Sequence, residues 1–235
     1  MIEIKNLLKT AIITIDMQND FVDPKGTMPV EGAMEIIPVM TGVLKAARQA
    51  GMPIIHIVRY YLPDGTNADL CRRELIASGV EIVAPGTKGA EVFDALKPGS
   101  FVGEMMDAHM LMSGVPQLIG EWEWAMYKPR WGAFYQTKLE DFLKEKGIDS
   151  LIFMGINFPN CPRTTIYEAS ERDFRLGLVT DAMSRLYDRG VDELKNIGVS
   201  MLTGQELIEN ICGLTKNDER FEAEDGREIL KTNLI

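Results

Sequence analysis

Short apolar runs alternate with helical patterns along most of this chain, and this order limits the possible folds more than any other feature. The run at residues 11–15 is apolar except for Thr14, which is typical of a strand buried on both faces of a sheet. Repeated strand–helix units predict a doubly wound α/β fold, with a mostly parallel sheet and helices on both faces. The expected strands cover residues 11–15, 53–58, 125–128, 151–154, 176–180 and 199–202, and the expected helices cover 34–50, 137–146, 163–175 and 190–197.

We expect all 235 residues to belong to a single domain, because no Gly-, Ser- or Pro-rich linker divides them and a chain of this length can bury one large core. Residues 59–124 follow a less regular pattern. From about residue 216 the sequence is rich in charge, which indicates an arm or a tail.

The formal net charge of −10 argues against nucleic acid and anionic membrane as partners, because both bind clustered Lys and Arg. We expect a small-molecule substrate instead. Three cysteines without paired spacing predict free thiols in a reducing compartment. The sequence shows no signal-like start and no uncharged apolar run of about 18 residues, so we expect a cytoplasmic protein.

Cys161 is the strongest candidate for a reactive residue. It stands between the apolar run 151–154 and a helical pattern, and Pro162 suits the first helical position. Unpaired N–H groups and the positive end of the dipole at a helix start favour a thiolate and can bind an oxyanion. A buried structural cysteine fits the position alone equally well.

Two further polar residues stand at the ends of predicted strands, Asp16 after residues 11–15 and Lys128 at the end of 125–128. In doubly wound sheets, ligands bind at the carboxyl ends of the strands, so we expect Asp16, Lys128 and Cys161 to converge. Each has another explanation: a turn cap for Asp16, a solvated strand end for Lys128, and core packing for Cys161. Three such coincidences at one edge favour a catalytic site.

Three segments resemble those of the isochorismatase-like cysteine hydrolases, a family that includes nicotinamidases, N-carbamoylsarcosine amidase, and biuret and ureidoacrylate amidohydrolases. The resemblance spans roughly residues 10–205. It implies a six-stranded parallel sheet, often in the order 3-2-1-4-5-6. The matching segments are 16–21, 128–134 and 155–161, the last followed by Thr164, Glu168, Ala169 and Asp173.

The resemblance also implies a catalytic triad of Asp16, Lys128 and Cys161. We expect Lys128 and the helix start to lower the pKa of the Cys161 thiol, and Asp16 to carry the thiol proton to the leaving nitrogen. The backbone N–H groups of Asn157 and Cys161 are expected to form an oxyanion hole. A cis peptide bond before Asn157 is usual in the family.

We expect no metal and no other cofactor. Metal-binding relatives carry an Asp-x-His cluster shortly after the second strand, whereas residues 58–64 contain no histidine. His56 lies inside an apolar run and is expected to be a hydrogen-bonded core residue, and His109 is expected at the surface.

Substrate recognition is harder to interpret. An arginine near the site would favour a substrate with a carboxylate or several carbonyl groups, and Arg59 follows the second predicted strand. Arg72 and Arg73 fit a solvated helix face at least as well. The residues assigned to substrate binding are Gln18, Phe21, Arg59, Tyr60, Trp131 and Phe158.

The remaining tryptophans, Trp122 and Trp124, are assigned to the core or to a subunit interface. We interpret Cys71 and Cys212 as structural. The expected assembly is a homo-oligomer, either a dimer or a tetramer.

Three functions remain open. The first is a metal-independent cysteine amidohydrolase that cleaves a C–N bond of a small carboxamide, carbamoyl or ureido compound through a thioester. The second is a vinyl ether hydrolase of the isochorismatase type, which needs no thiol, so that Cys161 argues against it. The third is a catalytically silent small-molecule-binding protein, against which the intact set of Asp16, Lys128 and Cys161 argues.

Overall fold

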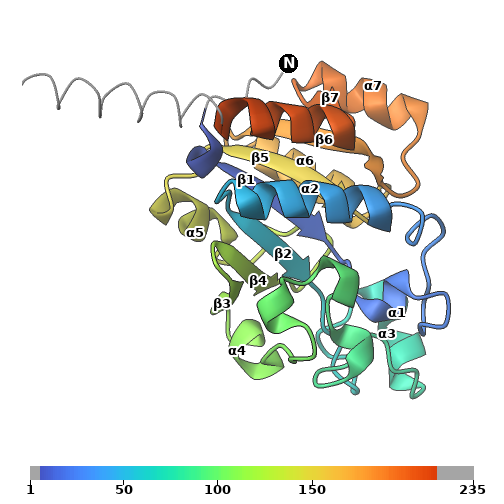
Figure 1. Cartoon of the computed structure of the whole chain (residues 1–235). Coiled ribbons are helices and arrows are strands. Elements are labelled where there is room, and N and C mark those ends of the chain that lie inside the picture. Colours follow the sequence, from blue (N-terminus) through green and yellow to red (C-terminus); the bar gives the residue numbers. More distant parts are fainter. Residues whose placement is uncertain (1–5, 216–235) are drawn as a thin grey trace, which may run out of the picture.

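The computed structural model describes residues 6–215, in which seven strands form one sheet (Figure 1). The strands are β1 (Thr10–Ile15), β2 (Ile54–Val58), β3 (Gln117–Gly120), β4 (Glu123–Tyr127), β5 (Ser150–Gly155), β6 (Arg175–Met183) and β7 (Ser200–Leu202). Their order in the sheet is β3-β4-β2-β1-β5-β6-β7. All neighbouring strands pair in parallel except β3 and β4, which are antiparallel.

The six parallel strands have the predicted order 3-2-1-4-5-6, and the doubly wound α/β fold class is confirmed. The expected count of six strands is wrong by one, because β3 adds an antiparallel strand at the edge of the sheet. This strand has only four residues, and its Leu118 side chain is exposed. A strand so short and so little buried leaves no clear apolar pattern in the sequence.

Helices cover both faces of the sheet. One face packs against α2 (Ile37–Gln49) and the helical residues 204–215, and the other against α5 (Leu139–Glu145), α6 (Cys161–Ser170) and α7 (Asp188–Asn196). Beyond the carboxyl ends of β1 and β2 lie α1 (Asn19–Val22) and α3 (Leu70–Ala77) (Figure 1). The other helices are α4 (Ala108–Met112) and the 3-10 turns Leu7–Lys9, Lys88–Ala90, Asp94–Leu96 and Gly99–Phe101.

The central strand β1 is buried along its whole length, as its apolar sequence predicts. Ile12 belongs to the core on the α2 side, whereas Ile13 belongs to the core on the side of α5 and α6. Successive side chains of a strand point to opposite faces, so a strand between two helical layers is apolar at most positions, and a polar residue such as Thr14 must find a hydrogen-bond partner.

Several element ends differ from the sequence prediction. The helix predicted at 163–175 begins earlier, at Cys161, and ends at Ser170. Asp173, with a φ of 61°, lies in the turn that leads directly into β6. The helix at 204–215 was not predicted. The charged segment from about residue 216 lies outside the described residues.

His56 is a buried, hydrogen-bonded core residue, as predicted. Its Nδ1 lies 2.7 Å from Thr14 Oγ1 and its Nε2 lies 2.7 Å from Glu123 Oε1. Arg48 donates two hydrogen bonds to the same buried carboxylate. The network satisfies buried polar groups on the sheet. His109 is exposed, also as predicted.

The two tryptophans assigned to the core or to an interface differ in burial. Trp124 is buried and packs edge-on against Phe142, whereas Trp122 is partly exposed at 44%. Across residues 6–215, none of the helices is both long enough and apolar enough to span a membrane.

Candidate active site

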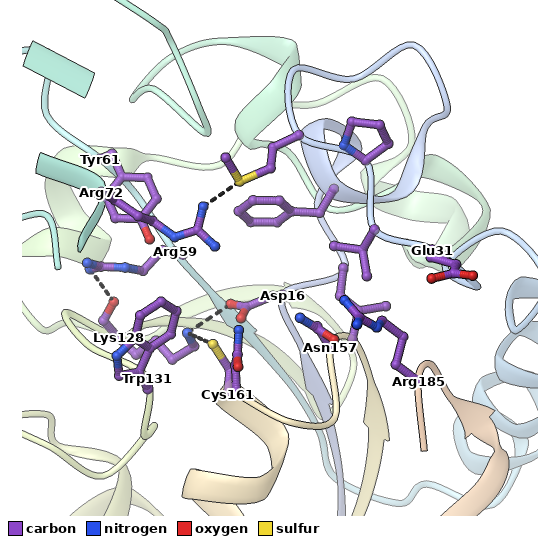
Figure 2. Close-up of a pocket in the computed structure, with 16 residues that line it drawn as sticks. Asp16, Glu31, Arg59, Tyr61, Arg72, Lys128, Trp131, Asn157, Cys161 and Arg185 are labelled. Atoms are coloured by element: carbon purple, nitrogen blue, oxygen red, sulfur yellow. Dashed lines mark hydrogen bonds and ion pairs between the residues drawn. The ribbon is translucent and has the colours of Figure 1, made fainter. Parts of the chain in front are cut away.

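Asp16, Lys128 and Cys161 lie together at the carboxyl end of the parallel sheet (Figure 2). Asp16 directly follows β1, Lys128 directly follows β4, and Cys161 is the first residue of α6. The Nζ atom of Lys128 lies 3.0 Å from Asp16 Oδ1 and 3.2 Å from Cys161 Sγ. The amine therefore contacts both the carboxylate and the thiol, as the sequence analysis expected, while their catalytic roles stay predictions.

Strand order explains why these residues meet. In the sheet, β2 lies on one side of β1 and β5 lies on the other. The strand order therefore reverses between β1 and β5. Doubly wound sheets bind their ligands at such a reversal. The N–H of Asp16 donates to the Ile57 carbonyl and that of Lys128 to the Val58 carbonyl, so the sheet's hydrogen bonds hold both residues at the edge.

Two residues at this edge have unusual backbone conformations. Asp16 has a φ of 56°, which is uncommon for a residue with a side chain and is often found at functional sites. Gly155 has a φ of 132°, and a Cβ atom there would lie 2.5 Å from the Ile15 carbonyl oxygen. Glycine is therefore required for the loop before Cys161 to approach the end of β1.

Lys128 is fully buried but remains charged because of its neighbours. Burial lowers the pKa of Lys128, but the Asp16 carboxylate and the Cys161 sulfur favour the ammonium, and the pKa stays above its ordinary value of 10.5. The site thus contains a buried ammonium–carboxylate ion pair, and removing one partner would leave the other charge buried without compensation.

The prediction of a lowered pKa for Cys161 is wrong for the resting site. Burial raises the pKa of this thiol to about 12, and the Asp16 carboxylate raises it further than Lys128 lowers it. The helix start and the cation were visible in the sequence, whereas the desolvation of the sulfur was not. Cys161 therefore rests as a neutral thiol beside the ion pair.

This raised pKa can be measured by following the ultraviolet absorbance of the thiolate against pH. The variant Cys71→Ser/Cys212→Ser removes the two exposed cysteines and leaves Cys161 as the single thiol. We expect no thiolate until the pH approaches about 12. The further change Asp16→Asn should lower the midpoint, because it removes a negative charge beside the sulfur.

The same protein unfolded in guanidinium is the control, with a midpoint near the ordinary value of 9.0. A folded protein that already absorbs as a full thiolate at neutral pH would contradict the neutral resting thiol.

The backbone N–H groups of Asn157 and Cys161 are available as donors, while their role as an oxyanion hole stays a prediction. Within residues 6–215, neither the Asn157 N–H nor the Cys161 N–H has a hydrogen-bond acceptor, and both residues line the cavity. Such free N–H groups can bind a developing negative charge. The peptide bond before Asn157 is trans, so the family's cis bond is absent among the described residues.

A cavity of about 320 Å³ opens over the three side chains. It is large enough for a small organic molecule. Of the predicted substrate-binding residues, three lie in its wall: Phe21, Arg59 and Trp131.

Three other predicted substrate-binding residues do not line this cavity. Gln18 is buried, and its amide joins the backbone of Arg59 and Ala90. Tyr60 is buried and stacks on Tyr127. Phe158 is buried against Tyr187. Their place outside the cavity wall arises because the direction in which each side chain points depends on the fold, not on nearness to the motif in sequence.

Several cavity residues were not assigned from the sequence. Tyr61 lines the cavity in place of Tyr60, and Arg72 and Arg185 reach it from α3 and from the loop after β6. Residues 28–31 form a further part of the wall. Arg59 and Tyr61 are two residues apart, and alternate residues of an extended segment point to the same side. This spacing could have predicted that Tyr61, rather than Tyr60, lines the cavity together with Arg59. The sequence favours a solvated helix face for Arg72 at least as strongly as a place in the site, and no local pattern marks Arg185.

The loop after Lys128 is held by α6, the helix that begins at Cys161. The Ala133 N–H donates to Thr165 Oγ1, which itself donates to the Cys161 carbonyl. The Phe134 N–H donates to the Glu168 carboxylate. These bonds connect the loop after Lys128 to α6 and so support the positions of the amine and the thiol.

A metal ion in a protein is usually held by several donor side chains that lie close together. Residues 6–215 contain no group of three or more His, Cys, Asp or Glu side chains placed to hold an ion. The absence of a cofactor stays a prediction.

Comparisons with known proteins agree with this geometry. A family model described as Isochorismatase domain matches residues 10–206. The chain is 32% identical over 209 residues to a protein of Arabidopsis thaliana named as a probable inactive nicotinamidase, covering 86% of this chain and 96% of that protein. It is 28% identical over 175 residues to the ureidoacrylate amidohydrolase RutB of Caulobacter segnis, covering 67% of this chain and 64% of that protein.

A solved structure is also similar. The crystal structure of an isochorismatase family protein from Desulfovibrio vulgaris matches with a TM-score of 0.71 and 31% identity. The match covers 87% of this chain and 98% of that one.

Proposed function

The chain belongs to the isochorismatase family, and from this premise we propose that it is a metal-independent cysteine hydrolase acting on a C–N bond of a small carboxamide, carbamoyl or ureido compound. The observation that carries the proposal is the position of Lys128. Its amine lies 3.0 Å from the Asp16 carboxylate and 3.2 Å from the Cys161 sulfur, in the wall of a cavity of ligand size.

The first half of the proposed reaction forms a thioester. Asp16 accepts the thiol proton as the Cys161 sulfur attacks the carbonyl carbon, and the Lys128 ammonium stabilises the negative charge that develops on the sulfur. The N–H groups of Asn157 and Cys161 hold the oxyanion. When the tetrahedral species collapses, the C–N bond breaks and Asp16 gives its proton to the leaving nitrogen.

The second half consumes one water molecule. Asp16 accepts a proton from the water as its oxygen attacks the thioester carbonyl. The C–S bond then breaks, the sulfur recovers the proton, and the acid is released. The balance is amide plus water to carboxylic acid plus ammonia, and for a ureido compound to a carbamic acid plus ammonia.

A catalytically silent binding protein is the second candidate, and the name of the Arabidopsis relative favours it. That name describes the relative. This chain has the carboxylate, the amine and the thiol within reach of one another, an arrangement that a purely binding site does not need.

The test is ammonia release from a panel of carboxamides, N-carbamoyl amino acids and ureas, with each protein sample measured before and after dialysis against a strong chelator. We expect turnover of at least one class of compound. The rates before and after dialysis should be equal, because the attacking group is a thiol. Zinc or manganese restoring a rate lost on dialysis would contradict metal independence. Absence of ammonia from the whole panel would favour the silent protein.

A further inference from the structure

Arg59 and Arg72 both line the cavity, but they differ in how their charges are balanced. The guanidinium of Arg59 donates to the Lys128 carbonyl at 3.1 Å, to the Asn67 carbonyl at 3.0 Å and to Asp69 Oδ2 at 3.3 Å. Its charge is neutralised by Asp69, and both of its Nη groups donate to these acceptors. Arg59, which the sequence analysis assigned to substrate binding, is therefore part of the cavity wall.

Arg72 has no such partners. Its Nε is buried without a hydrogen-bond acceptor, and no carboxylate within residues 6–215 forms an ion pair with it. One Nη contacts the sulfur of Met28, which is a weak acceptor. The guanidinium lies 5.6 Å from the centroid of the Trp131 ring. A desolvated donor without an acceptor is costly unless a ligand supplies one.

The other charges of the cavity do not compensate Arg72. Asp16 pairs with Lys128. Glu31 lies across the cavity, on the side of Arg185 (Figure 2). In a chain with a net charge of −10, this part of the wall is locally positive. It favours an anionic ligand.

We propose that the substrate carries a carboxylate that binds Arg72 while its scissile carbonyl lies over Cys161. This inference rests on the proposed hydrolase function and narrows its substrate class to acids. The planar guanidinium matches a carboxylate through two parallel N–H donors. Figure 2 shows Arg72 reaching into the same cavity that Asp16, Lys128 and Cys161 line.

The test compares acids with their neutral methyl esters, using the pairs succinamate and methyl succinamate, and N-carbamoylglycine and its methyl ester. Ammonia release gives kcat/KM for each compound. We expect the wild type to prefer at least one acid over its ester by about 10-fold or more, since one charge-assisted bidentate contact has this magnitude. The effect should lie mainly in KM, because Arg72 binds a group remote from the reacting carbon.

Arg72→Met should bring the acid-to-ester ratio close to 1 by raising KM for the acid. The matched control is Arg73→Met, the next residue of the same helix, which is exposed and does not line the cavity. It should keep the wild-type ratio. A wild type that prefers the esters, or an Arg72→Met variant that slows acid and ester equally, would overturn the inference and leave the amidase proposal standing.

Calorimetry separates this inference from the proposed function. Two proteins are compared, the variant Cys161→Ala and the double variant Cys161→Ala/Arg72→Met. Each is titrated with succinamate and with N-carbamoylglycine. Binding that is lost with Arg72 supports the carboxylate site even if the wild type hydrolyses neither acid. Absence of binding by both acids, or binding that does not depend on Arg72, would overturn it.

Discussion

Cys161→Ala should lower turnover by about 10⁴-fold or more, because no other group in the site can form the thioester. Of the three cysteines, Cys161 is the one that lines the cavity, whereas Cys71 and Cys212 are exposed outside it. The measurement is steady-state ammonia release with the best substrate of the panel. Thermal unfolding should show a folded protein, since the change removes only one buried sulfur.

Cys212→Ala is the matched control and should retain wild-type turnover. Rapid quenching of the wild type during turnover, followed by peptide mass analysis, should find the acyl group on the peptide that contains Cys161. Full activity in Cys161→Ala would exclude covalent catalysis by this thiol.

Lys128→Met should lower both activity and stability. We expect turnover to fall by about 10²- to 10³-fold, the usual cost of losing one preorganised electrostatic contact in a hydrolase site. The free energy of unfolding should fall by about 3–5 kcal/mol, because the buried Asp16 carboxylate loses its cation. The pKa of Cys161 should rise further, since Lys128 is the neighbour that lowers it.

The double variant Asp16→Asn/Lys128→Met distinguishes the two effects. It removes both buried charges, so denaturant unfolding should show much of the lost stability restored. Turnover should stay low, because the proton carrier is also gone. If Lys128→Met alone were as stable and as active as the wild type, the ion pair would have neither role.

The parallel strands could be predicted because their environment leaves a direct mark on the sequence. A strand covered by helices on both faces is apolar at most positions, and residues 11–15, with Thr14 as their one polar member, show this clearly. The edge strand β3 has no such environment, and its Leu118 side chain is 61% exposed. Its existence depends on pairing with β4, which is a contact between segments and not a local pattern.

The positions of Asp16, Lys128 and Cys161 could be predicted for a related reason. Each stands at the end of a recognisable strand or at the start of a recognisable helix, and parallel strands bring such ends to one edge. The surrounding wall did not follow from that rule. Arg72 and Arg185 come from segments whose paths across the edge are set by packing, and Tyr60 and Phe158 point away from the cavity.

The sequence by itself determined the parallel strands and the three polar residues that meet at their carboxyl edge. Tertiary structure alone decided the electrostatic state of those residues. Burial raises the pKa of Cys161 to about 12 although a helix start and a lysine stand beside it, and Asp69 neutralises Arg59 while Arg72 remains without a carboxylate partner among the described residues. Desolvation and charge pairing depend on which distant segments surround a group, and this information is absent from any local stretch of sequence.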